Sequence, residues 1–230
     1  SELAGRLLPA LVAALEHLVP RHGADAVYLC GGLAGLEGLA PALAGGGLPG
    51  AIHVAEEAHR AAVRAGLRLL EEESPASALA VDVGQTSIKC ASAVGLRVFE
   101  RDPEVLPILY IGQPRPTDGQ HVRAAVQFIA HALHTAASEL PRPPEALCLA
   151  LPCPLDEALV PGSCTYGWEE QAHLVADILG ASGLPAGGRA WVLNDAELGA
   201  VSAWRDARVR GRRVLCLTLG FGPGGALLER

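Results

Sequence analysis

The sequence predicts an α/β fold, because short apolar runs alternate with longer segments whose apolar residues repeat with a helical period. Half of the 230 residues are hydrophobic and 19% are charged, a composition that supports a buried core and argues against disorder. The order of the segments narrows the fold, since a run of antiparallel strands precedes alternating helices and strands. The chain is long enough for one large domain or two small ones.

The part of the chain before residue 74 mixes helices with short strands. Residues 1–23 repeat leucine with a helical period, and Ala26 to Cys30 is an apolar run that stops at Gly31-Gly32. We expect helices over 1–23, 36–43 and 56–73 and strands over 26–30 and 51–54. A charged helix end followed by a proline, at 71–77, indicates a boundary between two domains.

A new pattern begins at Ala78, where a buried strand runs into a turn at Gly84. We expect strands over 78–84, 87–94, 95–99, 146–151, 190–193 and 214–219, a further candidate strand over 107–111, and the start of a return strand at 226–228. Helices are expected over 121–140, 171–179 and 196–205. A β-meander followed by strand–helix repeats is an order found in α/β domains.

Charge and cysteine usage exclude several classes of function. The 25 acidic residues outnumber the 18 basic ones, which argues against general nucleic-acid affinity. The sequence contains no apolar run that suits a membrane span and no secretory signal pattern, so we expect a cytoplasmic protein. The six cysteines form no Cys-x-x-Cys pair and favour buried reduced thiols over disulfides. His131 and His134 could share a helix face, but without acidic or cysteine partners they do not predict a metal site.

Glycine turns follow buried strands at three places. They are Asp82-Val83-Gly84-Gln85-Thr86, Leu219-Gly220-Phe221-Gly222-Pro223-Gly224-Gly225 and Leu29-Cys30-Gly31-Gly32-Leu33-Ala34. Glycine lets the backbone approach a phosphate and direct N–H groups at it. A carboxylate at a strand end, such as Asp82, can hold Mg²⁺ through water. Each of these segments also fits an ordinary tight turn.

A polar pair, Asn194-Asp195, ends the strand over 190–193 and opens a helix. One interpretation is an ordinary helix N-cap, which both residue types supply well. The other is a general base, Asp195, held on a rigid strand end, with Asn194 orienting the same substrate.

Together these segments resemble the repressor–open-reading-frame–kinase (ROK) sugar kinases, a branch of the actin-like ATPase superfamily that includes bacterial glucokinases. The branch has Asp-x-Gly-Gly-Thr and Leu-Gly-Thr-Gly-x-Gly-Gly as phosphate loops, an Asn-Asp-Ala motif with the catalytic base, and a Gly-Gly-Gly strand end beside adenosine. Its Pro-Gly-Pro-Val-Asp and Gly-Trp segments are similar to Ala150–Asp156 and Tyr166-Gly167-Trp168. The resemblance implies an actin-like ATPase (ribonuclease H-like) fold of two lobes.

The resemblance also implies a site. Asp195 would be the catalytic base, Asn194 and Asp195 would bind a sugar, and Asp82 would position Mg²⁺ through water. The implied nucleotide contacts are Asp82, Gly84, Gln85, Thr86, Gly220, Gly222, Gly224, Gly31 and Gly32. ATP, Mg²⁺ and a small-molecule sugar are the expected ligands and a homodimer is possible, with no nucleic acid, membrane or structural zinc expected. The family's Glu-x-Gly-His and zinc-binding cysteine motifs do not occur in the chain.

The order of the motifs differs from that of the family, in which the adenosine-side segment comes last. The simplest explanation is a circular permutation, with residues 76–205 as the first lobe and residues 1–75 plus 206–230 as an incomplete second lobe. The alternative is that the N-terminal part completes a neighbouring copy, by domain swapping or from a tandem fusion.

The phosphate loops differ from the family at Gln85, Phe221 and Pro223, and Cys30 replaces the first adenosine-side glycine. The resemblance as a whole makes an ATP-dependent sugar kinase the main hypothesis. These differences raise the alternative, a degenerate relative that binds a sugar or nucleotide without turnover. A repressor would need a winged helix, for which the chain has no residues. The arginines at 205, 208, 210, 212 and 213 fit a solvated connector better than a contact with nucleic-acid phosphates.

Overall fold

The computed structural model describes residues 2–45, 50–73, 77–110, 112–114, 116, 119–185, 188–220 and 222–229. It divides the chain into two compact units, one formed by Ser1–Ala65 with Ala196–Arg230 and the other by Gly66–Asp195. The chain passes between the units within helix α3 (Ala58–Glu73) and at the start of helix α6 (Asp195–Arg205). The expected linker residues 74–76 lie outside the described residues.

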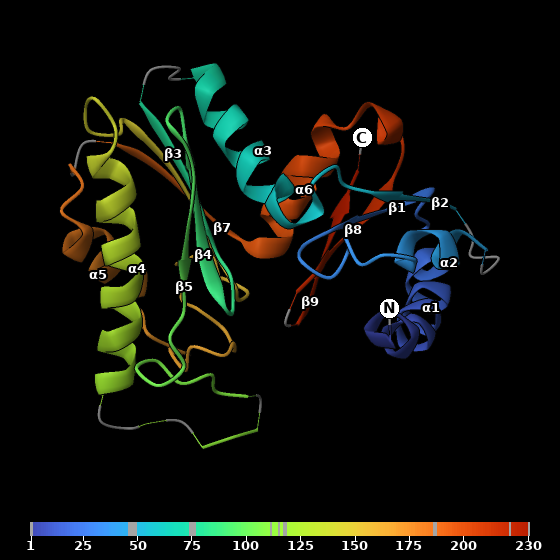
Figure 1. Cartoon of the computed structure of the whole chain (residues 1–230), viewed down its shortest axis with the longest axis horizontal. Helices are drawn as coiled ribbons and strands as arrows, with labels where there is room; N and C mark the ends of the chain where they lie inside the picture. Colours follow the sequence, from blue (N-terminus) through green and yellow to red (C-terminus); the bar gives the residue numbers. More distant parts are fainter. Residues whose placement is uncertain are drawn as a thin grey trace. The chain divides into compact units, whose positions relative to one another are not determined.

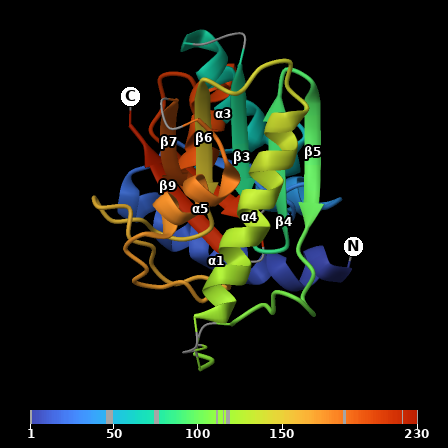
Figure 2. The same ribbon diagram turned by 90° about the vertical axis from the view of Figure 1, so that its left-hand side faces the viewer.

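The continuous unit, residues 66–195, contains a five-stranded mixed sheet in the order β5-β4-β3-β6-β7. Its strands are β3 (Ala78–Val83), β4 (Ser87–Ser92), β5 (Gly95–Glu100), β6 (Ala146–Leu151) and β7 (Arg189–Asn194). The meander β3-β4-β5 is antiparallel, whereas β3, β6 and β7 run parallel. Helices α4 (Gln120–Ser138) and α5 (Leu174–Ser182) lie together over one face of this sheet (Figure 2).

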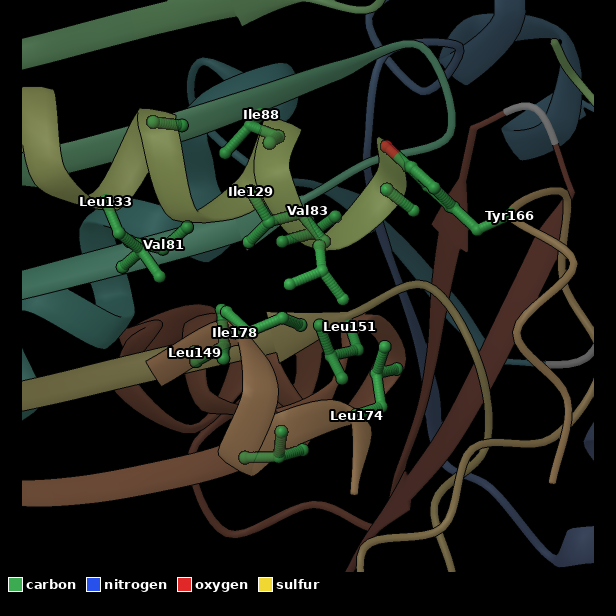
Figure 3. Close-up of a cluster of buried hydrophobic side chains, with 14 of the residues drawn as sticks. Val81, Val83, Ile88, Ile129, Leu133, Leu149, Leu151, Tyr166, Leu174 and Ile178 are labelled. Atoms are coloured by element: carbon green, nitrogen blue, oxygen red, sulfur yellow. The ribbon is translucent and has the colours of Figure 1, made fainter. Parts of the chain in front are cut away.

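The core of this unit lies between the sheet and these two helices (Figure 3). Side chains alternate along a strand, so Val81 and Val83 join this core whereas Ala80 and Asp82 belong to the opposite face. Ile129 and Leu133 of α4 and Ile178 of α5 are fully buried against it. Burial of side chains of this size contributes about 1.5–3 kcal/mol each.

The discontinuous unit contains a four-stranded sheet in the order β2-β1-β8-β9 (Figure 1). Besides most of α6 and the first part of α3, its elements are α1 (Glu2–His22), β1 (Ala26–Cys30), α2 (Leu39–Gly45), β2 (Ala51–Val54), the 3₁₀ turn η1 (Ala207–Val209), β8 (Val214–Leu219) and β9 (Pro223–Leu228). Strand β1 pairs in parallel with β8 in the register Ala26 to Val214. The structure thus confirms that the N-terminal segment and the strand at 214–219 build one sheet, within one chain.

The two sheets share one strand order. In each, a central strand has an antiparallel neighbour joined by a glycine turn on one side and two successive parallel strands on the other. The order β9-β8-β1-β2 in one sheet corresponds to β4-β3-β6-β7 in the other, in which β5 is an additional edge strand. Helices precede and separate the parallel strands in the same way, α1 and α2 in one unit and α4 and α5 in the other.

The candidate strand over 107–111 is wrong for residues 107–110, which form no strand, and Ile111 lies outside the described residues. The N–H of Leu109 donates to the carbonyl of Thr165 at 3.0 Å, and the guanidinium of Arg101 donates to the carbonyl of Pro107. Pro107 also has no N–H to give to a strand neighbour. The segment is therefore held by a loop and a buried side chain.

Candidate functional site

The predicted site residues of the continuous unit lie where the parallel strands end. In the sheet register, Asp82 is level with Ala150 and Leu151 is level with Asn194, so Gly84, Pro152 and Asp195 follow at the same edge. Adjacent strands lie about 4.8 Å apart, so two spacings, roughly 10 Å, separate the backbones at Gly84 and Asp195. The carboxyl edge of a sheet with parallel strands is where α/β proteins bind ligands.

The turn between β3 and β4 has a glycine because its backbone is crowded. The N–H of Gly84 donates to the carbonyl of Ser87 at 2.8 Å, and a Cβ added at Gly84 would lie 2.8 Å from the same oxygen. This N–H therefore has a partner within the turn, and its expected contact with a phosphate stays a prediction. The N–H groups of Gln85 and Thr86 donate to no backbone carbonyl in the part of the chain that the structure describes. Successive N–H groups of this kind form a concavity that suits an anion.

The Gln85 side chain clamps this turn to a second loop. Its amide nitrogen donates to the carbonyl of Pro152 at 3.2 Å, and its amide oxygen accepts from the N–H of Thr165 at 3.3 Å and from the Thr165 hydroxyl. Gln85 thus ties the turn to the loop through its side chain.

Arg101 holds the same turn from the other side, and it is only 6% exposed. Its guanidinium donates to the carbonyls of Gln85, Leu106 and Thr165 at 3.1, 2.9 and 2.9 Å. The guanidinium also lies 4.0 Å from the ring centre of Tyr166, a cation–π contact. The N–H of Arg101 donates to the carbonyl of Thr86 at 2.8 Å, so both ends of the turn are anchored.

Asp82 forms a partly buried ion pair with Lys89 on the neighbouring strand, with 3.3 Å between the two groups. The pair places a positive charge beside the carboxylate expected to position Mg²⁺. A magnesium ion at Asp82 would therefore share that carboxylate with an ammonium group, or displace it.

Asn194 is the last residue of β7 and Asp195 is the first of α6. Both are half-buried, and both have polar interactions. An acidic residue at a helix N-terminus is stabilised by the helix dipole, so the capping interpretation stays open. Through Ala150 of β6, Leu193 is level with Asp82, so these two residues share one face of the sheet. Side chains alternate along a strand, so Asn194 belongs to the other face, the one that Leu151 occupies.

The remaining predicted nucleotide contacts belong to the discontinuous unit. Gly31 has a left-handed backbone, with φ of +93°, and a Cβ there would lie 2.8 Å from the carbonyl carbon of Leu219. The turn at Gly31 and Gly32 is thus packed against the end of β8, and the N–H of Leu33 donates to the Leu219 carbonyl at 2.9 Å.

Gly220 and Gly222 lie in the turn between β8 and β9, where no atom lies closer than 4.0 Å to an added Cβ. Gly224, in β9, is level with Thr218 of β8. Phe221 lies outside the described residues. Two of the three glycine turns are therefore adjacent within one unit.

A further glycine, Gly199, was not singled out by sequence. A Cβ at this position of α6 would lie 2.8 Å from the hydroxyl of Thr218 and 2.9 Å from the sulfur of Cys30, so α6 packs tightly on β1 and β8. A glycine inside a predicted helix was the available signal. Arg101 gave no such signal, because its partners lie up to 64 positions away.

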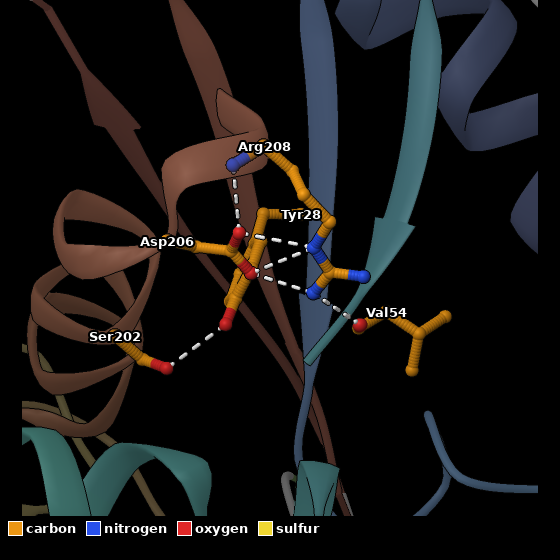
Figure 4. A network of polar contacts seen from close by, with 5 residues as sticks. All are labelled: Tyr28, Val54, Ser202, Asp206 and Arg208. Atoms are coloured by element: carbon orange, nitrogen blue, oxygen red, sulfur yellow. Dashed lines mark hydrogen bonds and ion pairs between the residues drawn. The ribbon is translucent and has the colours of Figure 1, made fainter. Parts of the chain in front are cut away.

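The arginine-rich connector after α6 is partly engaged in ion pairs (Figure 4). Arg208 pairs with Asp206 at 2.5 Å and donates to the carbonyl of Val54 at 3.0 Å. Beside this pair, the hydroxyls of Tyr28 and Ser202 hydrogen-bond at 3.0 Å. Arg213 pairs with Glu229 at 2.5 Å.

Within the described residues, no three His, Cys, Asp or Glu side chains are grouped to hold a metal ion. In the same part of the chain, no helix has the length and apolar character needed to cross a membrane. Comparison of the chain with protein-family models, curated proteins and solved structures found no match in any of the three.

Proposed function

We propose that this chain is a circularly permuted relative of the ROK sugar kinases, with the two-lobe fold of actin-like ATPases, and that it phosphorylates a sugar hydroxyl from ATP in the cytoplasm. The observation that supports this most is the shared strand order of the two sheets. Each has a glycine turn between its central strand and the antiparallel neighbour. Two like units with matching phosphate-type turns fit a nucleotide-binding protein better than a single α/β domain does.

The proposed chemistry needs a phosphate cradle and a base. The N–H groups of Gln85 and Thr86 would meet phosphate oxygens, taking the role expected of Gly84, whose N–H is used within the turn. When bound, ATP with Mg²⁺ supplies the transferable phosphoryl group and offsets its negative charge. Preorganised donors of this kind lower the barrier because they do not have to reorient during the reaction.

Asp195 would accept the proton of the attacking sugar hydroxyl, and Asn194 would orient the sugar. Gly84 and Asp195 follow parallel strands at the same edge of the sheet, with Pro152 between them, so a ligand bound over this edge would lie near both. A carboxylate at a strand end is backed by the sheet, so its position is well defined.

The second candidate function is a binder of sugar or nucleotide that does not turn over. The pairing of Asp82 with Lys89 favours it, since the carboxylate proposed for Mg²⁺ is already neutralised. The side-chain clamp on Gln85 favours it as well, because it limits adjustment of the turn to a ligand.

The test has two measurements. Calorimetry measures the binding of MgATP and of each sugar, and an assay of ADP release measures turnover with a panel of hexoses, amino sugars and their derivatives. We expect wild-type turnover with at least one sugar and a 10²–10⁴-fold lower rate for Asp195→Asn, at unchanged ATP affinity. Asp177→Asn, which alters an exposed carboxylate of α5, is the matched control and should keep full activity. ATP binding without turnover would favour the binder. No binding at millimolar MgATP would contradict the kinase and leave the binder only if calorimetry detects one of the sugars, and no binding of either ligand class would contradict both functions.

A further inference from the structure

Two cysteines lie at the ends of the loop to which the Gln85 side chain is hydrogen-bonded. Cys153 directly follows Pro152, and Cys164 directly precedes Thr165, the two residues that receive the Gln85 side chain. Neither cysteine is in a disulfide, and both are buried, at 3% and 4% exposure. The clamp and the two thiols thus occupy the same few residues of the loop.

The loop between these cysteines folds back on itself. The N–H of Gly162 donates to the carbonyl of Pro154 at 2.8 Å, and Leu155 forms an antiparallel bridge with Pro161. The chain ends of this loop are therefore held together. One Gln85 side chain contacts both Pro152, next to Cys153, and Thr165, next to Cys164, so the two cysteines lie close together. Two thiols on the closed ends of one loop need little movement to form a disulfide.

Cys153 also lies beside a buried indole. Trp168 is fully buried and stacks on Tyr166 with 4.4 Å between ring centres. Among the described residues its Nε1–H has no hydrogen-bond partner. A thiolate at Cys153 would offer an acceptor to this buried N–H.

The other buried thiols differ from Cys153. Burial raises the pKa of Cys90, Cys148 and Cys216 to about 12, and such thiols are unreactive at neutral pH. The hydrogen bond from Cys164 lowers the pKa of Cys153, against burial and the charges of Asp195 and Glu169, and the Trp168 N–H lowers it further. The pKa of Cys164 is raised by that same hydrogen bond and by burial.

We propose that Cys153 and Cys164 are an oxidisable pair that forms a disulfide on exposure to hydrogen peroxide. The Cys153 thiolate attacks one peroxide oxygen, which breaks the O–O bond, releases hydroxide and leaves a sulfenic acid. The sulfur of Cys164 then displaces the sulfenic oxygen, which leaves as water with the thiol proton. In sum, two thiols and one peroxide give one disulfide and two waters, with the thiols oxidised and the peroxide reduced.

A disulfide between Cys153 and Cys164 would fix the positions of Pro152 and Thr165, because each of these residues is bonded to one of the two cysteines. Gln85 would then keep both partners of its clamp. This modification site is independent of the proposed kinase activity, because the chemistry needs only the loop and the turn that it holds.

The test treats the full-length chain with hydrogen peroxide, counts free thiols, and maps disulfides after digestion with glutamyl endopeptidase without reduction. Cleavage after Glu145, Glu157 and Glu169 separates residues 146–157, with Cys148 and Cys153, from residues 158–169, with Cys164. We expect loss of two of the six thiols and a cross-linked pair of these peptides that dithiothreitol separates. The Cys148→Ser variant should give the same pair, which assigns the bond to Cys153.

Cross-linking that disappears in Cys148→Ser would overturn the assignment, as would disulfides between chains. Retention of all six thiols, or higher oxides of Cys153 without a cross-link, would overturn the proposal itself. The mapping of the unaltered chain does not depend on a variant folding. Cys90→Ser, which changes a buried thiol of the same unit, is the matched control and should leave the cross-link intact.

Discussion

The hydroxyl of Tyr166 donates a hydrogen bond of 2.8 Å to the carbonyl oxygen of Gly84, across a separation of 82 positions in the chain. The ring that carries this hydroxyl lies between the guanidinium of Arg101 and the indole of Trp168. The position of the turn after β3 therefore depends on a loop that follows β6.

Tyr166→Phe should lower the free energy of unfolding by about 1–3 kcal/mol, since it leaves the Gly84 carbonyl without this donor but keeps the ring. Chemical denaturation measures the change. Tyr110→Phe, at a tyrosine that is 51% exposed, is the control and should stay within about 0.5 kcal/mol of the wild type. Equal losses in both variants would show that the bond to Gly84 has no special weight.

Arg101→Lys should destabilise the protein more strongly, by roughly 3 kcal/mol, because an ammonium group cannot reproduce the planar fork that reaches several carbonyls. Arg97→Lys is the matched change on an exposed side chain that pairs with Glu139 at 2.8 Å. Thermal unfolding of both variants measures the difference. A melting temperature for Arg101→Lys as high as that of Arg97→Lys would contradict the anchoring role.

Gly31→Ala should lower stability by about 2 kcal/mol or more, because the new Cβ would meet the Leu219 backbone and the φ of +93° strains any L-residue. Gly32→Ala is the control, since no atom lies within 4 Å of its added Cβ. Denaturant unfolding should therefore separate the two neighbours clearly. Similar stability for both would mean that the β8 end can move away at little cost.

Asp206 should make stability depend on pH. Hydrogen bonds and charge from Arg208 lower the Asp206 pKa, so its contribution is present above the pKa of the unfolded carboxyl and is lost as pH falls through the folded one. Wild type should thus lose stability as pH falls from about 4. Asp206→Asn should lose about 1 kcal/mol at pH 7 and show a flatter acid profile. An acid profile unchanged from that of wild type would refute this.

The sequence was a good guide to the strands and a poor one to what fixes the turns. Apolar runs located β1, β3, β6 and β8, because a strand buried on both faces needs apolar residues throughout. The resemblance brought β1 and β8 into one sheet, and their pairing confirmed it. The candidate strand over 107–110 failed because Pro107 and the Arg101 guanidinium replace the ladder that the apolar pattern suggested.

The candidate site was predictable only as a set of strand ends. Asp82, Asn194 and Asp195 could be placed at one edge from the parallel order alone. Contacts such as Gln85 with Thr165 join residues 80 positions apart, and no local pattern in the sequence encodes them. The same limit applies to Cys153 and Cys164, which lack the spacing of a recognisable dithiol motif.

The interrupted unit also has a consequence for how the polypeptide can fold while a ribosome makes it. Residues 66–195 form a continuous segment and can become compact once they emerge. Strand β1, whose five residues are all buried, must wait for β8, since Cys30 and Thr218 are 188 positions apart. For most of synthesis, β1 therefore offers an apolar strand without its β8 partner, and we expect nascent chains to need shielding by a chaperone.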